Sequence, residues 1–288
     1  MSNAISINGL TKQYGKKVVL DNLSFSVEKG EIFGLLGANG AGKTTTLECI
    51  EGLRKYDVGK IDVFGSVGVQ LQSSTLPENI TAWEAFKLFC LWNNIEEDDS
   101  LFNRFFSLDL KGKQYGKMST GQKRRLHLIL ALITDPEIIF LDEPTAGLDV
   151  EGRVSLHSEL LKLKKQGKTI VIASHDMAEI ESLCDHIVIL KSSKIVFDGT
   201  PSELTSNFLN DINIYIKAEE QISDFSIKKS KYQGFSKNYH VFKTTTLDDA
   251  LLEILKIFKE KKNKIADIRI EHETLEKRFI EIASQEEN

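Results

Sequence analysis

The sequence GANGAGKTT, from Gly37 to Thr45, lies between an apolar run and a segment of helical character. It fits the pattern G-x-x-x-x-G-K-[ST], in which glycines allow a tight turn that directs backbone amides at phosphate oxygens. The run IFGLL before it predicts a strand. The segment TTLECIEGL after it predicts a helix, whose N-terminal dipole favours an anion. Strand, loop and helix together predict a site for the phosphates of a nucleotide.

Several residues of this loop are candidate nucleotide contacts. Lys43 is expected to reach the β- and γ-phosphates, and the hydroxyl of Thr44 to bind Mg²⁺. The remaining contacts expected from the loop are Gly37, Asn39, Gly40, Ala41, Gly42 and Thr45. The loop by itself does not separate kinases, small GTPases, helicases and transporters, so the class depends on the rest of the chain.

A pair of carboxylates ends a second apolar run, in EIIFLDEPTAGLD from 137 to 149. A buried strand that ends in Asp142 and Glu143 places both at the carboxyl edge of a sheet, where α/β folds bind ligands. Asp142 is expected to hold the metal ion directly or through water. Glu143 is expected to polarise the attacking water, as a water-positioning residue does in phosphoryl transfer.

Apolar runs that alternate with helical segments predict an α/β fold for most of the chain. The runs IIFL and IVIA are continuous, as expected for parallel strands covered on both faces. Residues 5–34 read as short strands separated by glycines. The segment ENITAWEAFKLFCLWNN, with apolar residues at helical spacing, opens a helical subdomain over about 77–134.

The character of the chain changes at DGTPSELTSN, from 198 to 207. We therefore predict one domain over 1–204 and a second over 205–288. In the second domain, INIYIKAEE and YHVFKT alternate apolar and polar residues, whereas LDDALLEILKIFKEKKN is amphipathic with helical spacing. These patterns predict a small α+β domain.

Composition excludes several classes of protein. The 288 residues carry a net charge of −5, which argues against general affinity for nucleic acid. Cys49, Cys90 and Cys184 lack metal-ligand spacing and are read as reduced cytosolic thiols. No secretory signal is recognised. The most apolar stretch, LHLILALI, is shorter than the roughly 20 residues that span a bilayer.

Four motifs occur together in the order GANGAGKTT, MSTGQ, IIFLDEPTAGLD and IVIASHD. In this order and at these intervals they resemble the ATP-binding subunit of ABC transporters, over roughly residues 4–204. The resemblance implies a P-loop NTPase core with an antiparallel β subdomain and a helical subdomain. It also implies hydrolysis of ATP, with ATP and Mg²⁺ as ligands.

The resemblance assigns roles to residues outside the phosphate loop. Tyr14 is placed to stack on adenine, and an aromatic face against a base is favourable. His175 in SHD is expected to contact the γ-phosphate, and Asp149 to lie in the loop that connects two protomers. The metal-site glutamine is Gln72 or Gln70 in VGVQLQSS. Gln72 is favoured, which leaves Gln70 as a strand side chain.

The segment MSTGQ, from 118 to 122, has the place of the family's signature sequence. Ser119, Gly121 and Gln122 are expected to contact ATP, and Ser119 to start the following helix. Thr120 stands where the family has a glycine, and its bulk is expected to lower ATP affinity without abolishing function. In the family, the signature acts on ATP held by a second chain, so a homodimer is expected.

The resemblance also implies an integral membrane permease as partner and a peripheral position at the cytoplasmic face of the membrane. The end of the chain, HETLEKRFIEI, resembles the tail of exporter subunits, although Arg278 replaces an acidic residue. This favours export of drugs, antibiotics, peptides or lipids. The alternative classes are a soluble ABC-type ATPase acting on nucleic acid or ribosomes, and a small-molecule P-loop kinase.

The aromatic residues Trp83, Phe86, Phe89 and Trp92 recur at three-residue spacing. We expect them to pack the interior of the helical subdomain. The alternative is an exposed groove that receives a helix of the membrane subunit.

Overall fold

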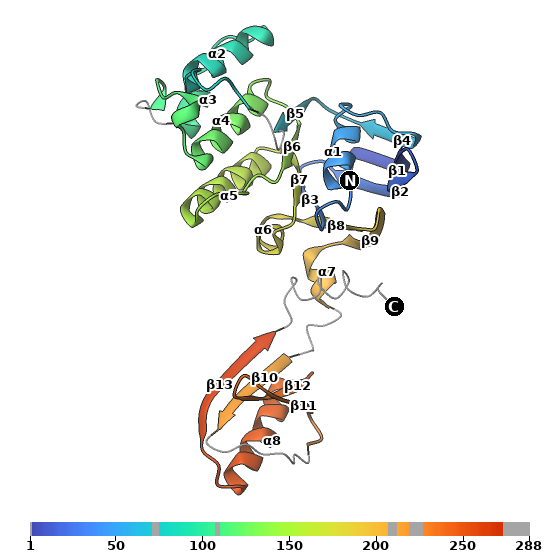
Figure 1. The fold of residues 1–288 in the computed structure, drawn as a ribbon, viewed down its shortest axis with the longest axis vertical. Coiled ribbons are helices and arrows are strands. Elements are labelled where there is room, and N and C mark those ends of the chain that lie inside the picture. Colours follow the sequence, from blue (N-terminus) through green and yellow to red (C-terminus); the bar gives the residue numbers. More distant parts are fainter. Residues whose placement is uncertain (1, 71–74, 107–109, 207–211, 219–226, 273–288) are drawn as a thin grey trace. The chain divides into compact units, whose positions relative to one another are not determined.

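The computed structural model describes residues 2–70, 75–106, 110–206, 212–218 and 227–272 (Figure 1). The chain divides into two compact units, Met1–Thr200 and Pro201–Asn288. The second unit begins with the short helix α7 (Pro201–Ser206). The candidate site lies entirely within the first unit.

A six-stranded sheet, in the order β5-β6-β7-β3-β8-β9, forms the centre of the first unit. The strands are β3 (Ile32–Gly37), β5 (Val67–Gln70), β6 (Ile138–Asp142), β7 (Thr169–Ser174), β8 (His186–Lys191) and β9 (Lys194–Gly199). The first five in the sheet order are parallel, and β9 pairs antiparallel with β8. β3, β6 and β7 are buried along their whole length, because both faces of the sheet are covered.

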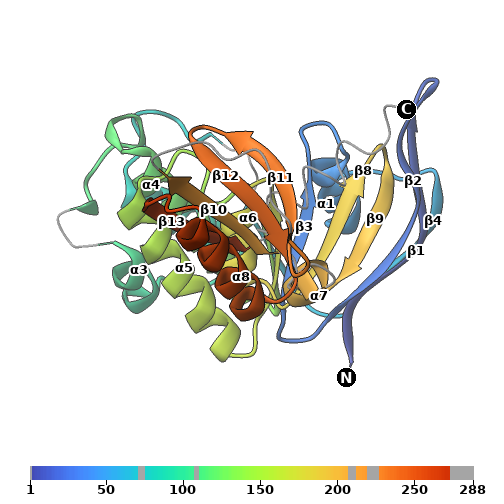
Figure 2. The same cartoon turned by 90° about the horizontal axis from the view of Figure 1, so that it is seen from below.

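A separate antiparallel sheet, in the order β2-β1-β4, covers one side of this core. Its strands are β1 (Asn3–Tyr14), β2 (Lys17–Glu28) and β4 (Val58–Val63). The helix α1 (Lys43–Ile50) lies between the two sheets (Figures 1 and 2). Apolar side chains from both sheets and from α1 form one continuous core. This core fixes the phosphate loop, which connects β3 to α1.

The other side of the central sheet carries the remaining helices of the first unit, α2 (Ala82–Trp92), α3 (Asp99–Phe105), α4 (Thr120–Leu132), α5 (Val150–Lys165) and α6 (Met177–Leu183), with a 3-10 turn over Tyr115–Lys117. α4 contacts α2, α3 and β5, which joins the helical subdomain to the sheet edge. Thr81 and Glu84 form a capping box that starts α2. In the described part of the chain, no helix is long and apolar enough to cross a membrane.

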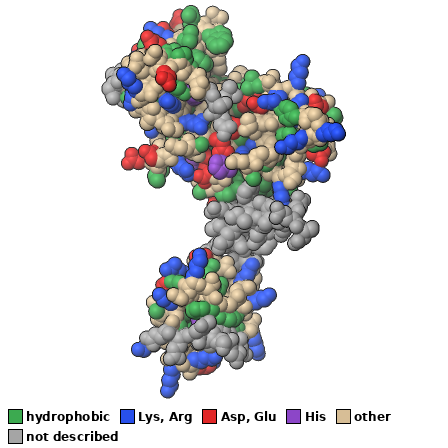
Figure 3. Space-filling model, in the orientation of Figure 1, with side chains coloured by type: hydrophobic (Ala, Val, Ile, Leu, Met, Phe, Trp, Pro, Cys, Tyr) green, Lys and Arg blue, Asp and Glu red, His purple; other side chains and the backbone are tan. Residues whose placement is uncertain are grey.

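The expected aromatic packing of the helical subdomain is only partly found. Phe86 is fully buried, and its ring contacts Trp83 and Phe102. The prediction that Trp92 packs in the core is wrong, because this residue is 77% exposed at the last position of α2. Leu88 and Leu91 are exposed with it, and hydrophobic side chains are visible over α2 in Figure 3. Periodicity placed the apolar residues on one helix, but the neighbouring helices cover only part of its circumference.

The second unit contains a four-stranded antiparallel sheet in the order β11-β12-β10-β13. Its strands are β10 (Ile212–Ala218), β11 (Lys231–Ser236), β12 (Tyr239–Thr244) and β13 (Ile265–His272). α8 (Leu247–Glu260) buries Ala250, Ile254 and Phe258 against one face of this sheet. The described residues thus combine strands and a helix as expected. β11 was not expected, because KYQGFS lacks a regular apolar alternation. The LEKRF tail lies outside the described residues.

Candidate nucleotide site

The phosphate loop has a backbone shape that glycine permits. Gly42, directly before α1, has φ of +108°, a conformation that L side chains rarely adopt. A Cβ added there would lie 2.7 Å from Leu20 Cδ2 and 2.9 Å from the Val19 carbonyl oxygen. The loop therefore turns tightly at the start of α1, where the free backbone N–H groups and the helix dipole favour an anion.

Lys43, the first residue of α1, directs its ammonium group back into this loop. Nζ donates a hydrogen bond to the carbonyl oxygen of Gly37 at 2.7 Å and lies 3.7 Å from Glu143 Oε1. Lys43 and Glu143 are 6% and 7% exposed. A buried ammonium needs a counter-charge and hydrogen-bond acceptors, and both are present here.

Thr44 and Asp142 meet at the carboxyl end of β6. The Thr44 hydroxyl donates to Asp142 Oδ2 at 2.8 Å. Burial raises the pKa of Asp142 above its usual range, and the Thr44 hydrogen bond offsets part of this shift. The second oxygen, Oδ1, is buried and has no hydrogen-bond partner among the described residues.

This pair fits a hard cation that takes most of its ligands from phosphate and water. A hydroxyl and a buried carboxylate with an unpartnered oxygen are oxygen ligands of the kind Mg²⁺ prefers, and Mg²⁺ sites often use only one or two protein side chains. In the described ranges, His, Cys, Asp and Glu form no group of three or more that could hold a metal without such help.

Glu143 occupies a strained backbone position beyond β6. Its φ is +50°, in the left-handed region, which is rare for a residue with a side chain. Its N–H donates to the carbonyl oxygen of Ala173 in β7 at 2.9 Å, which holds the turn. A carboxylate oxygen of Glu143 lies 2.8 Å from Nδ1 of His175, just after β7. Strands β6 and β7 thus bring the carboxylate and the imidazole together.

A cavity of about 480 Å³ contains most of the residues expected to bind nucleotide. Its lining residues are Tyr14, Lys17, Val19, Ala38, Asn39, Gly40, Gly42, Lys43, Thr44, Thr45 and Glu143. Gly37 and Ala41 are buried instead of lining it. Lys17, the first residue of β2, was missed by the sequence analysis, because a lysine in a hairpin has no motif to mark it.

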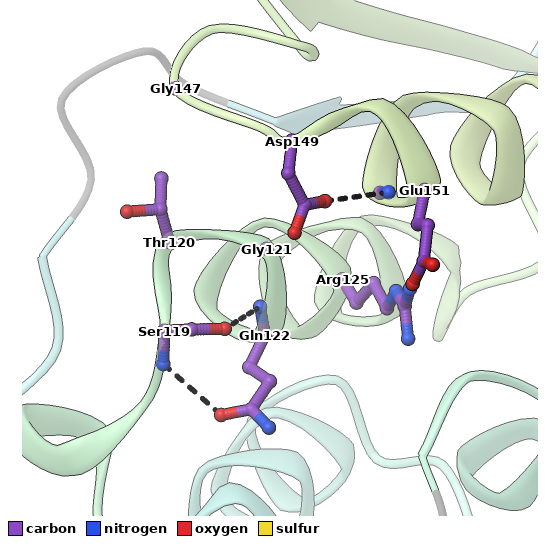
Figure 4. A pocket seen from close by; sticks show the side chains of 9 residues that line it. Ser119, Thr120, Gly121, Gln122, Arg125, Gly147, Asp149 and Glu151 are labelled. Carbon is purple, nitrogen blue, oxygen red and sulfur yellow. Dashed lines mark hydrogen bonds between the residues drawn. The ribbon is translucent and has the colours of Figure 1, made fainter.

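The signature residues line a second cavity, of about 390 Å³ (Figure 4). Its residues are Ser119, Thr120, Gly121, Gln122, Arg125, Gly147, Asp149, Glu151 and Gly152. Ser119 starts α4 as expected: its Oγ accepts from the Gln122 N–H at 3.3 Å, and its own N–H donates to Gln122 Oε1 at 3.1 Å. Asp149 starts α5, because its Oδ1 accepts from the Gly152 N–H at 2.8 Å.

Thr120 points toward the loop between β6 and α5 (Figure 4). A Cβ added at Gly147 would lie 3.2 Å from Thr120 Cγ2, and Gly147 has φ of +75°. The side chain that replaces the expected glycine therefore packs beside this loop of the same chain, next to Asp149. Its bulk also borders the signature cavity.

Within one chain, the signature residues and the phosphate-loop residues line separate cavities. Among the described residues, no signature residue lines the phosphate-loop cavity, and no phosphate-loop residue lines the signature cavity. The metal-site glutamine is only partly placed. Gln72 lies outside the described residues. Gln70 is a strand residue at the end of β5, 3% exposed.

Comparisons with known proteins agree on one class of protein. A sequence profile described as ABC transporter matches residues 20–146. An uncharacterized ABC transporter ATP-binding protein of Methanocaldococcus jannaschii is 36% identical over 205 residues, 69% of this chain and 78% of that protein. The Nod factor export ATP-binding protein I of Burkholderia orbicola is 37% identical over 218 residues, 69% of this chain and 72% of that protein.

A solved structure shows the same fold at low sequence identity. It is described as a dimeric post-hydrolysis state of an ATP-binding cassette bound to ADP and Pi. It has a TM-score of 0.61 and 22% identity, and the match covers 68% of this chain and 98% of that one. The predicted P-loop NTPase fold of the α/β class is confirmed.

The fold, the phosphate loop and the acidic end of β6 define an NTPase of the P-loop class. Among such NTPases, this chain belongs to the ABC transporter ATP-binding family, whose members hydrolyse ATP. The sequence-based predictions of the family and of ATPase activity are confirmed. The chain is the ATP-binding subunit of a transporter.

The buried charge of Asp142 gives a pH-dependent prediction. A raised folded-state pKa means that the protonated form stabilises the fold below about pH 4, and this contribution is lost as the pH rises through the raised pKa. At pH 7.5 the ionised carboxylate is a cost without its cation. Asp142→Asn should therefore increase the free energy of unfolding of the nucleotide-free protein by about 1 kcal/mol. For a chain of this size, that corresponds to a rise in melting temperature of about 2–4 °C.

The same variant should remove the extra stabilisation that Mg²⁺ gives in the presence of ADP, measured by thermal denaturation. Asp135→Asn is the matched control, because the side chain of Asp135 is 91% exposed, and it should change the melting temperature little. A lower melting temperature for Asp142→Asn at pH 7.5 would show that the ionised carboxylate stabilises the empty protein.

Proposed function

We propose that two copies of this chain pair head to tail, with each ATP held between the phosphate loop of one copy and the signature residues of the other. The separation of the two cavities carries this proposal, because one chain supplies both halves of a nucleotide site and does not bring them together. The exposed positions of Ser119 and Asp149 suit a contact with a second chain. The solved cassette of the same fold is described as dimeric.

In this proposal, the residues of the first cavity bind the nucleotide. Tyr14 stacks on the adenine, and the loop from Gly37 to Thr45 surrounds the phosphates. Thr44 and Asp142, with Gln72, hold Mg²⁺, which neutralises charge on the phosphates when it is bound. Lys43, whose ammonium already lies within the loop beside Gly37 and Glu143, contacts the β- and γ-phosphates.

Glu143 and His175 are the proposed catalytic residues beside Lys43. The Glu143 carboxylate, fixed by its Ala173 backbone bond, accepts a hydrogen bond from the attacking water and orients it. His175 holds one edge of this carboxylate at 2.8 Å, and its side chain is 58% exposed. It can therefore leave Glu143 and donate to the γ-phosphate when nucleotide arrives.

ATP joins the two copies, because its γ-phosphate contacts Lys43 of one copy and the N-terminus of α4 of the other. Ser119, Gly121 and Gln122 lie at that N-terminus, where the positive end of the helix dipole favours an anion. Hydrolysis removes the bridging phosphate, and the pair opens. When the two copies close and open in this way, a partner protein bound to them can be driven between two conformations.

That partner is, in our proposal, an integral membrane permease, with this subunit at the cytoplasmic face of the membrane. Export is favoured because relatives with 37% identity are named Nod factor export ATP-binding proteins. The cargo class, among drugs, antibiotics, peptides and lipids, would be set by the permease. Action on nucleic acid is disfavoured by the net charge of −5, and Figure 3 shows acidic and basic side chains interspersed.

The proposed dimer is tested with Glu143→Gln, which keeps the size of the side chain and removes its charge. With ATP and Mg²⁺, light scattering should show a species of twice the 32.4 kDa chain mass, while ATP turnover falls by about 10²- to 10³-fold. Lys43→Ala should instead weaken nucleotide binding. Glu96→Gln, at an exposed carboxylate, should behave like the natural protein. Near-normal turnover in Glu143→Gln would contradict the role of Glu143.

The membrane partner is tested by purifying the tagged chain from detergent-solubilised membranes of its own host. A hydrophobic protein with several membrane spans should copurify in a fixed ratio and change the rate of ATP hydrolysis. Recovery of nucleic acid or ribosomal proteins in that place would favour the alternative class.

A further inference from the structure

Tyr14 lies at the tip of a hairpin, which by itself would hold its ring loosely. It is the last residue of β1, and β2 begins at Lys17 after a turn at Gly15 and Lys16. The residue is 44% exposed and lines the phosphate-loop cavity. An exposed ring at such a position loses conformational freedom when a base stacks on it, and that loss weakens binding.

Arg54 removes much of this freedom. Its Nη1 donates a hydrogen bond to the Tyr14 hydroxyl at 2.6 Å, and its guanidinium carbon lies 5.6 Å from the ring centroid. Its Nε donates to Glu48 Oε2 at 2.5 Å. Glu48 belongs to α1, the helix that starts at Lys43. One side chain therefore connects the hairpin tip to the helix of the phosphate loop.

A second contact restrains the same tip from the same connecting segment. Lys12 Nζ lies 5.4 Å from the Tyr14 ring centroid and 3.1 Å from Asp57 Oδ1. Asp57 Oδ2 accepts a hydrogen bond from the Gln13 N–H at 2.7 Å. The segment between α1 and β4 thus contacts Tyr14 through Arg54 and the end of β1 through Asp57.

We propose that Arg54 is a positioning residue for the nucleobase: it holds the Tyr14 ring in a fixed place relative to the phosphate loop before a nucleotide binds. The inference rests on the proposed stacking of Tyr14 on adenine. Because the ring is ordered in advance, stacking costs less conformational entropy. Arginine suits this position, since its planar group donates to Glu48 and to Tyr14 at the same time, which a lysine ammonium cannot do with the same geometry.

The test compares ADP with tripolyphosphate, which has no base, by titration calorimetry on the full chain. Arg54→Met should weaken ADP binding by about 3- to 10-fold, the loss expected for one ordinary intramolecular hydrogen bond, and should leave tripolyphosphate affinity unchanged. Tyr14→Phe, which keeps the ring and loses the bond, should weaken ADP to a similar extent. Lys60→Met is the charge-matched control, because Lys60 lies on β4 opposite Asn8, and it should leave both affinities unchanged.

A double-mutant cycle separates positioning from simple charge attraction. In a Tyr14→Ala background, Arg54→Met should have no further effect on ADP affinity. The proposal would be overturned if Arg54→Met weakened the binding of ADP and tripolyphosphate equally. It would also be overturned if Arg54→Met weakened ADP binding equally with and without Tyr14. Either result would leave the stacking role of Tyr14 intact. Unchanged ADP affinity in Tyr14→Ala would instead reject the stacking role, and the positioning role with it.

Discussion

The buried contact between Lys43 and Glu143 is the interaction on which the site depends. An ammonium and a carboxylate, both nearly excluded from solvent, stand 3.7 Å apart at the edge of the central sheet. Each would be costly to bury without the other. The contact joins the start of α1 to the end of β6, and His175 extends it to β7. Three elements distant in sequence thereby define one point beside the phosphate loop.

Residues with a local signal were predictable, and residues placed only by tertiary contacts were not. The runs IIFL and IVIA are buried strands, and Gly42 has the positive φ that its motif requires. In contrast, Arg54 and Tyr14 are 40 positions apart in the sequence, so no local sequence pattern predicts their contact. Trp92 followed the helical period of its neighbours but faces solvent, because packing covers only part of α2.

The fold gives Thr120 a role in the signature that the sequence does not show. The sequence shows only that a larger side chain replaces a glycine. In the fold, its methyl group lies beside Gly147, in the loop that leads to Asp149. The residue thus connects the two segments that we propose to face the second chain. The signature and this loop are therefore expected to move together when the dimer closes.

If each ATP site is shared between two chains, two variants that are defective in opposite halves of the site should complement each other when they are mixed. In a Glu143→Gln background, a Lys43→Ala chain and a Ser119→Arg chain should each fail to dimerise with ATP. Mixed together, they contain one intact phosphate loop opposite one intact signature. We expect a heterodimer that retains one ATP for two chains. A mixture that stays monomeric, with no retained ATP, would contradict it.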